Sequence, residues 1–116
     1  MAYTLDYGGS EINDRLACAK AAPIDSISAA TTLTAVHQAH LLLVNGTYTI
    51  TIASGLPVGM ECEVMNYGSG TVTIAAASGV TLNGSSGGSK TVPSRYTSAV
   101  LKCVASNTWV IQGAIT

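Results

Sequence analysis

From Ser26 to the carboxyl end, apolar residues tend to recur at every second position, and this period most limits what the chain can fold into. The clearest run is Thr47–Ile52, in which Tyr48, Ile50 and Ile52 share one face. Strict alternation is typical of β-strands that bury one face and expose the other to water. We therefore expect a mainly β protein built from half-buried strands.

The same period predicts the buried face of the later strands. Glu61, Glu63 and Lys102 should stay in water, so their immediate neighbours in the chain should point inward. The residues expected to face the core are Met60, Cys62, Val64, Val72, Ile74, Val80, Leu82, Leu101, Cys103, Trp109 and Ile111. The residues expected to face outward beside the last of these are Thr108, Val110 and Gln112.

Turn signals separate these runs. They are Asn45-Gly46, Gly55-Leu56-Pro57, Tyr67-Gly68-Ser69-Gly70, Asn83-Gly84 and Ser106-Asn107. Short strands with turns about every 8–12 residues are typical of β-sandwiches and small barrels. The sequence predicts a small antiparallel β-sandwich, jelly-roll-like or barrel-like, over residues 25–116. Residues 1–24 are expected to form an amino-terminal anchoring arm and one short helix.

One ten-residue pattern occurs twice. Thr47–Leu56 (TYTITIASGL) aligns with Thr71–Val80 (TVTIAAASGV) at an offset of 24 residues. A solenoid normally needs at least three repeats. We therefore interpret the two copies as strand-and-turn units in equivalent positions of a sandwich, with a short β-helical stretch as the alternative.

The expected helix lies near the amino end. Ser10 is a suitable N-cap, and Ile12, Leu16 and Ala19 fall on one face before Pro23 ends the run. A helix of about twelve residues is marginal on its own, so another surface must cover this stripe. The cover is either the protein's own sheet or the same helix from neighbouring copies.

The composition excludes several classes of partner. Only 9% of the 116 residues are charged, against roughly 25% in an average soluble domain. Five basic and six acidic side chains leave no basic excess to neutralise a row of phosphates, so we expect no nucleic-acid partner. No apolar run is long enough to span a bilayer, so we expect no membrane partner. The amino end lacks the pattern of a secretory signal peptide, so we expect synthesis in the cytoplasm.

Gly84–Thr91 (GSSGGSKT) nearly matches a phosphate-binding loop. Ser89 stands where that pattern has its second glycine, and Val92-Pro93 leaves no room for the helix that would follow. We interpret the segment as a flexible surface loop.

Two pairs of side chains resemble parts of a metal site or a catalytic site, but each lacks the further residues that such a site needs. His37 and His40 are three residues apart and lack a third nearby ligand, unless a threefold axis supplied one histidine from each subunit. We interpret them as polar histidines of a loop or sheet edge. Glu61 and Glu63 share a strand face with no acids predicted opposite them, so they read as a solvated face rather than a paired carboxylate site.

Cys18, Cys62 and Cys103 are scattered and form no C-x-x-C pair, so we expect reduced and mostly buried thiols. No G-x-S-x-G nucleophile elbow occurs either. We therefore predict no catalytic residue, no metal and no cofactor, and we expect that the protein is not an enzyme.

The segment from about Leu56 to Gly113 resembles a β-module of tailed-bacteriophage structural proteins. The motifs that carry the resemblance are LPVGM at 56–60, VMNYGSGTVTI at 64–74, SGVTLNG at 78–84 and NTWVIQG at 107–113. Separately, Tyr7–Leu16 (YGGSEINDRL) is similar to the opening of phage head fibres and tail fibres, where a short helix begins near a threefold axis. The resemblance implies a homotrimer with Ile12, Leu16 and Ala19 at its interface.

These observations lead to two functional expectations. The first is a non-enzymatic virion protein, a homotrimeric capsid decoration or head-fibre protein that assembles in the bacterial cytoplasm. In this hypothesis an amino-terminal arm with Tyr3, Leu5 and Tyr7 anchors it to the major capsid protein. The alternative is a tail-fibre or adhesin tip module that binds host glycans, with Tyr67 and Tyr96 as its exposed aromatic residues.

Overall fold

A computed structural model describes residues 22–116 of the chain. The expected short helix and arm, with Ile12, Leu16, Ala19, Tyr3, Leu5 and Tyr7, lie outside the described residues. The strands are β1 (Ile24–Ile27), β2 (Thr31–Leu33), β3 (Leu41–Val44), β4 (Thr49–Ile52), β5 (Glu61–Asn66), β6 (Val72–Ala76), β7 (Thr81–Leu82), β8 (Ser85–Ser86), β9 (Ser89–Val92), β10 (Ser98–Ala105) and β11 (Thr108–Gly113). Within residues 22–116, the one helical element is the 3-10 turn η1 (Ala35–His37).

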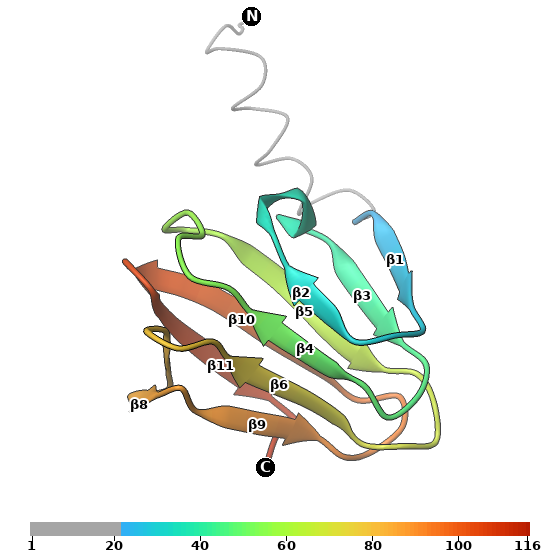
Figure 1. The fold of residues 1–116 in the computed structure, drawn as a ribbon. Helices are drawn as coiled ribbons and strands as arrows, with labels where there is room; N and C mark the ends of the chain where they lie inside the picture. Colours follow the sequence, from blue (N-terminus) through green and yellow to red (C-terminus); the bar gives the residue numbers. More distant parts are fainter. Residues whose placement is uncertain (1–21) are drawn as a thin grey trace, which may run out of the picture.

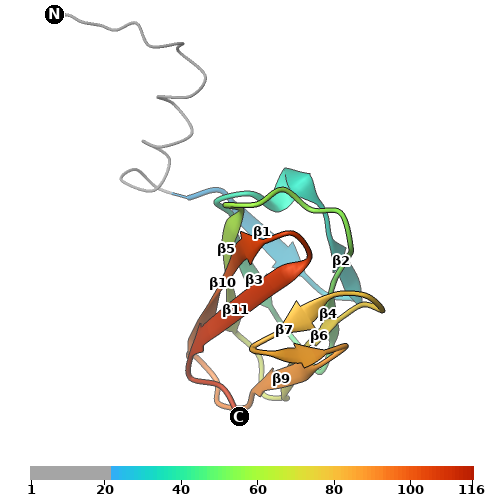
Figure 2. The ribbon, with the colours of Figure 1, turned by 90° about the vertical axis from the view of Figure 1, so that its left-hand side faces the viewer.

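The strands form two sheets that pack face to face. The seven-stranded sheet has the order β1-β3-β5-β10-β11-β7-β8, and the four-stranded sheet has the order β2-β4-β6-β9. Figure 1 shows the four-stranded sheet in front of the seven-stranded sheet, with the strands running obliquely across the view, and Figure 2 shows the sheets as two facing layers. None of the described elements is a helix long and apolar enough to cross a membrane.

The first six strands wind as three coils, each contributing one strand to either sheet. The coils are β1–β2, β3–β4 and β5–β6, and neighbouring coils pair in parallel in both sheets. A chain that returns to the same sheet through the opposite one must arrive in the same direction, which makes the pairs parallel. The prediction of an antiparallel sandwich is therefore wrong for this half, and both sheets are mixed.

The repeated pattern is explained by this winding. Ile50 pairs with Ile74 and Thr49 with Thr73, so β4 and β6 lie side by side in parallel at the same 24-residue offset as the repeat. The two copies do occupy equivalent positions, as predicted. They do so as adjacent coils of a short β-helical stretch, which was the alternative interpretation.

The carboxyl-terminal strands stop the winding. β9 pairs with β6 and β10 pairs with β5, both antiparallel, and β10 forms a hairpin with β11. Thr91 and Thr116 exchange two backbone hydrogen bonds of 2.9 and 3.0 Å, which places the carboxyl end along β9. The first coil, in contrast, is terminal in both sheets.

The core lies between the sheets, and its membership confirms the predicted strand faces. Every residue predicted to point inward from the period of two is buried, Trp109 included. Further core residues are Leu33, Leu42, Val44, Ile50, Ile52, Val92 and Ala99, with Tyr48 packed at the margin. Alternation identifies these positions because successive side chains of a strand point to opposite faces.

The outer faces of the two sheets differ in chemistry. The four-stranded sheet presents hydroxyl groups, from Thr32, Thr49, Thr51, Thr73 and Thr91. The seven-stranded sheet presents mixed side chains. Its aliphatic members, which we call the apolar face, are Ile24, Leu41, Leu43, Met65, Val100 and Val110. Glu63 lies among them, paired in register with Leu41 on one side and Val100 on the other. Of the two outer faces, the second therefore offers the larger aliphatic surface to another molecule.

Candidate functional site

An exposed aromatic cluster lies where the third coil meets the carboxyl-terminal strands. Tyr67 follows the end of β5, and Tyr96 stands two residues before β10. Their side chains are 45% and 61% exposed, and their rings meet edge to face with centroids 5.7 Å apart. The structure thus brings together the two tyrosines that the sequence marked as ligand-facing.

Arg95 completes this cluster. Its guanidinium carbon lies 4.7 Å from the centre of the Tyr96 ring, within the range of a cation–π contact. Its Nε donates a hydrogen bond of 3.4 Å to the carbonyl oxygen of Tyr67. Sequence reasoning missed Arg95, although its place between Pro93 and Tyr96 in a turn was a signal that could have drawn attention to it.

Asn66 holds the two parts of the cluster in place from inside the fold. Its buried amide nitrogen donates to the carbonyl oxygens of Gly70, at 2.7 Å, and Val92, at 2.8 Å. Its backbone carbonyl accepts from the amide of Tyr96 at 2.6 Å, and its own amide donates to Thr97 at 2.9 Å. One residue therefore ties the turn after β5 to the turn before β10.

The backbone of Tyr96 is strained. Its φ angle is +65°, in the left-handed region that residues with bulky side chains rarely adopt. Such a conformation costs about 1–3 kcal/mol and persists only where the surroundings over-determine it. The hydrogen bonds of Asn66 supply that constraint, and the result is a tyrosine ring held at a set angle on the surface.

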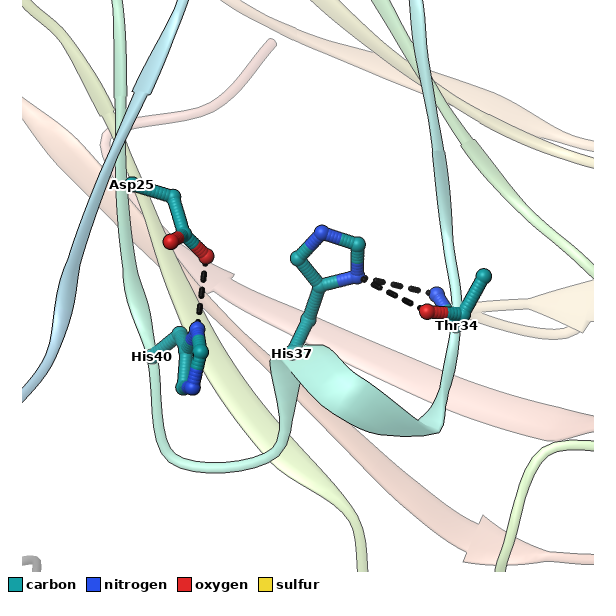
Figure 3. Close-up of polar contacts among 4 residues, drawn as sticks. All are labelled: Asp25, Thr34, His37 and His40. Carbon is teal, nitrogen blue, oxygen red and sulfur yellow. Dashed lines mark hydrogen bonds and ion pairs between the residues drawn. The ribbon is translucent and has the colours of Figure 1, made fainter.

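The two histidines lie at the other candidate position, in the turn between the first and second coils. Thr34 donates its amide hydrogen to Nδ1 of His37 at 3.0 Å, while Nδ1 of His40 lies 2.6 Å from Oδ2 of Asp25. Figure 3 shows the two side chains directed to these separate partners. Asp25, which sequence reasoning did not single out, lies on the terminal strand β1.

The histidines serve the backbone and the sheet edge, as the interpretation of polar loop and edge residues predicts. Within residues 22–116, no three histidine, cysteine or acidic side chains gather closely enough to hold a metal ion.

Glu61 and Glu63 lie on the outer face of β5, as predicted. Glu61 is exposed, and Glu63 accepts a hydrogen bond of 2.7 Å from the hydroxyl of Ser98. Beside them, the apolar face has an open hollow of about 200 Å³, lined by Ala22, Ala39, His40, Leu41, Glu61, Cys62, Glu63 and Val100. The Glu63 carboxylate thus lies within the apolar face, because Glu63 pairs in register with Leu41 on β3 and with Val100 on β10.

The glycine-rich segment is not a phosphate-binding loop. Asn83 and Gly84 form the turn of the β7–β8 hairpin, and Ser89 begins β9, which carries Lys90 and Thr91. The interpretation as a flexible loop is also wrong, because β8 pairs with β7 and β9 pairs with β6.

The described cysteines, Cys62 and Cys103, are buried and unpaired, as expected. Burial raises the pKa of the Cys62 thiol to about 12. The thiol therefore stays protonated at neutral pH, and a protonated thiol is a poor nucleophile and metal ligand. Cys18 lies outside the described residues.

Comparison with known proteins identifies no relative: no protein-family model matches the chain, and no curated protein matches it in sequence.

Proposed function

We propose that the chain is a non-enzymatic virion structural protein, a capsid-attached decoration or head-fibre protein that assembles as a homotrimer. The observation that supports this most directly is the apolar face of the seven-stranded sheet. Ile24 is 60% exposed there, and Leu41, its partner in register on β3, is only partly buried. Covering aliphatic surface of this kind with another molecule removes it from water and so lowers the free energy of the complex.

The first coil adds a second surface suited to assembly. Within residues 22–116, no strand pairs with the outer edges of β1 and β2. Neither strand carries a lysine, although both are short, with four and three residues, and β1 carries the charged Asp25. Val36 beside them is 72% exposed. Neighbouring copies or a capsid shell would cover these groups.

The arrangement around a threefold axis follows from the resemblance to phage fibres. Three copies around one axis can bury the same patch on every subunit, which suits a chain with few charges. In this proposal the amino-terminal arm with Tyr3, Leu5 and Tyr7 binds the major capsid protein. The stripe of Ile12, Leu16 and Ala19 contributes to the trimer contact.

Sedimentation and particle binding test the proposal. At micromolar concentration the purified chain should have a sedimentation mass three times that of one 11.7 kDa chain. Particles of the virus that encodes the chain, stripped of this protein, should recover it when it is added back. A chain lacking residues 1–7 should remain trimeric and fail to bind. A monomer, or attachment unchanged by the deletion, would contradict the proposal.

A second candidate function is a tip module of a tail fibre or adhesin that binds host-surface glycans. The exposed pair of Tyr67 and Tyr96 favours it, since binding sites use aromatic surface together with a few placed polar groups. A glycan array probed with the purified protein tests this candidate, and an array without binding would argue against it.

A further inference from the structure

We propose that Tyr67, Arg95 and Tyr96 form a binding site for an acidic saccharide. The apolar face of a sugar ring would pack on an exposed tyrosine ring, and its carboxylate or phosphate would bind the Arg95 guanidinium. This inference rests on the second candidate function and names its ligand class.

The guanidinium has donors to spare. Arginine carries five N–H donors, and the structure assigns only Nε of Arg95, to the carbonyl of Tyr67. The ion pair found within residues 22–116 is His40–Asp25, so in that part of the chain Arg95 has no carboxylate partner. Contact with the Tyr96 ring holds the cation beside aromatic surface instead. An arginine so placed is suited to bidentate recognition of an anion.

The tyrosine rings supply the rest of the recognition surface. Their planes are inclined at 65°, so the rings do not stack face to face, and each side chain keeps about half of its surface in water. Tyr48, in contrast, packs against the core. Aromatic rings next to a fixed cation offer apolar contact and charge together, which fits a saccharide that carries an anionic group better than a neutral one.

The cluster is also preorganised. The amide of Tyr96 is bound to Asn66, and the hydroxyl of Thr97 donates to the carbonyl of Ser94 at 2.6 Å. These contacts fix the turn and maintain the left-handed backbone of Tyr96. Because the turn is already ordered, binding a ligand here costs little conformational entropy of the loop.

Calorimetric titration tests the inference with three probes. They are an oligogalacturonate, which carries carboxylates, a glycerol-phosphate oligomer, and a neutral galactose oligosaccharide as the uncharged match. The full-length protein should bind one or both acidic probes at least about tenfold more tightly than the neutral probe, as expected when a charge-assisted hydrogen bond is made. The stronger acidic probe identifies carboxylate or phosphate as the preferred group.

Two variants locate the site. Arg95→Gln should weaken acidic binding by about tenfold or more and should weaken neutral binding by less, so the preference for acidic probes should fall. Tyr67→Ala should weaken the binding of every probe that the protein binds, because the sugar ring loses part of the aromatic surface on which it packs. Lys102→Gln is the matched control, because it removes one cation from within β10, outside the cluster of Tyr67, Arg95 and Tyr96. It should leave the affinity for every probe within about twofold. Thermal unfolding of each variant verifies that it is folded.

The outcomes separate this inference from the functions it builds on. Equal affinity for neutral and acidic probes, or unchanged acidic binding in Arg95→Gln, overturns the acidic ligand class and leaves a glycan-binding tip in place. No binding of any probe at millimolar concentration overturns this inference, and a glycan array without binding overturns the tip function as well. Neither result affects the proposed virion function, which sedimentation and particle attachment measure independently.

Discussion

The amide side chain of Asn66 illustrates how much a single polar residue contributes to this fold. It is fully buried, its nitrogen donates to two carbonyl groups, and its oxygen accepts from the amide of Gly68 at 3.3 Å. Asparagine is common in turns, and here it occupies the last position of β5. Its hydrogen bonds satisfy the carbonyl groups of Gly70, in the turn after β5, and Val92, at the end of β9, which would otherwise need water.

We expect Asn66→Ala to lower the free energy of unfolding by about 2–3 kcal/mol, because it leaves buried carbonyl groups without donors. Urea unfolding measures the loss. Ser69→Ala, at an exposed position of the same turn, is the control and should change stability by less than about 0.5 kcal/mol. Equal stability of the two variants would show that water replaces the Asn66 amide.

At the scale of elements, the coils depend on close approach between their turns. A side chain at Gly70, in the turn between β5 and β6, would collide with Oγ1 of Thr47, in the turn before β4. An added Cβ would also lie 3.1 Å from Cβ of Thr47 and 3.2 Å from its amide nitrogen. Glycine therefore permits the second and third coils to stack at this end.

Gly70→Ala should destabilise the protein by about 1–3 kcal/mol, the usual cost of overpacking. Removing the Thr47 hydroxyl relieves the closest contact, so the double variant Thr47→Ala/Gly70→Ala should recover part of the loss. Urea unfolding of the two single variants and the double variant gives the coupling between the positions. Strictly additive effects would place the strain elsewhere.

The direction of strand pairing could not be predicted from the sequence. The period of two identified the inward face of β4, β5 and β6, and the repeat identified β4 and β6 as equivalent. Parallel and antiparallel strands share this period, so alternation contains no information about the direction of the partner. The direction depends on the winding of the whole chain, which is why the antiparallel prediction was wrong.

At the scale of the molecule, the same substitution on each of the two outer faces tests which face forms the contact between copies. Leu43 on β3 and Thr51 on β4 both point outward and are partly buried, one on the apolar face and one among the threonines. Their partners in register, Met65 for Leu43 and Ala75 for Thr51, are uncharged. The same substitution at either position therefore adds the same charge to a comparable sheet surface.

In the proposed trimer, Leu43→Glu should shift the protein to a monomer at micromolar concentration, because a carboxylate in an apolar interface is costly to desolvate. Thr51→Glu should leave the trimer intact. Sedimentation measures both, and circular dichroism verifies that the variants are folded. If Thr51→Glu dissociates the trimer and Leu43→Glu does not, the threonine face is the interface.

The sequence by itself determined the inward face of the strands from β4 onward that alternate clearly, because alternation, turn residues and hydrophobicity are local properties of the chain. It also determined that Tyr67 and Tyr96 lie beside turns. It did not reveal the buried Asn66 or the buried residues of β2, β3 and β9. Only the tertiary structure decided that three coils stack in parallel and that Arg95 meets Tyr67, which is 28 residues away. Such contacts depend on how strands pair across the whole molecule, and that pairing follows from burying both sheets against one core.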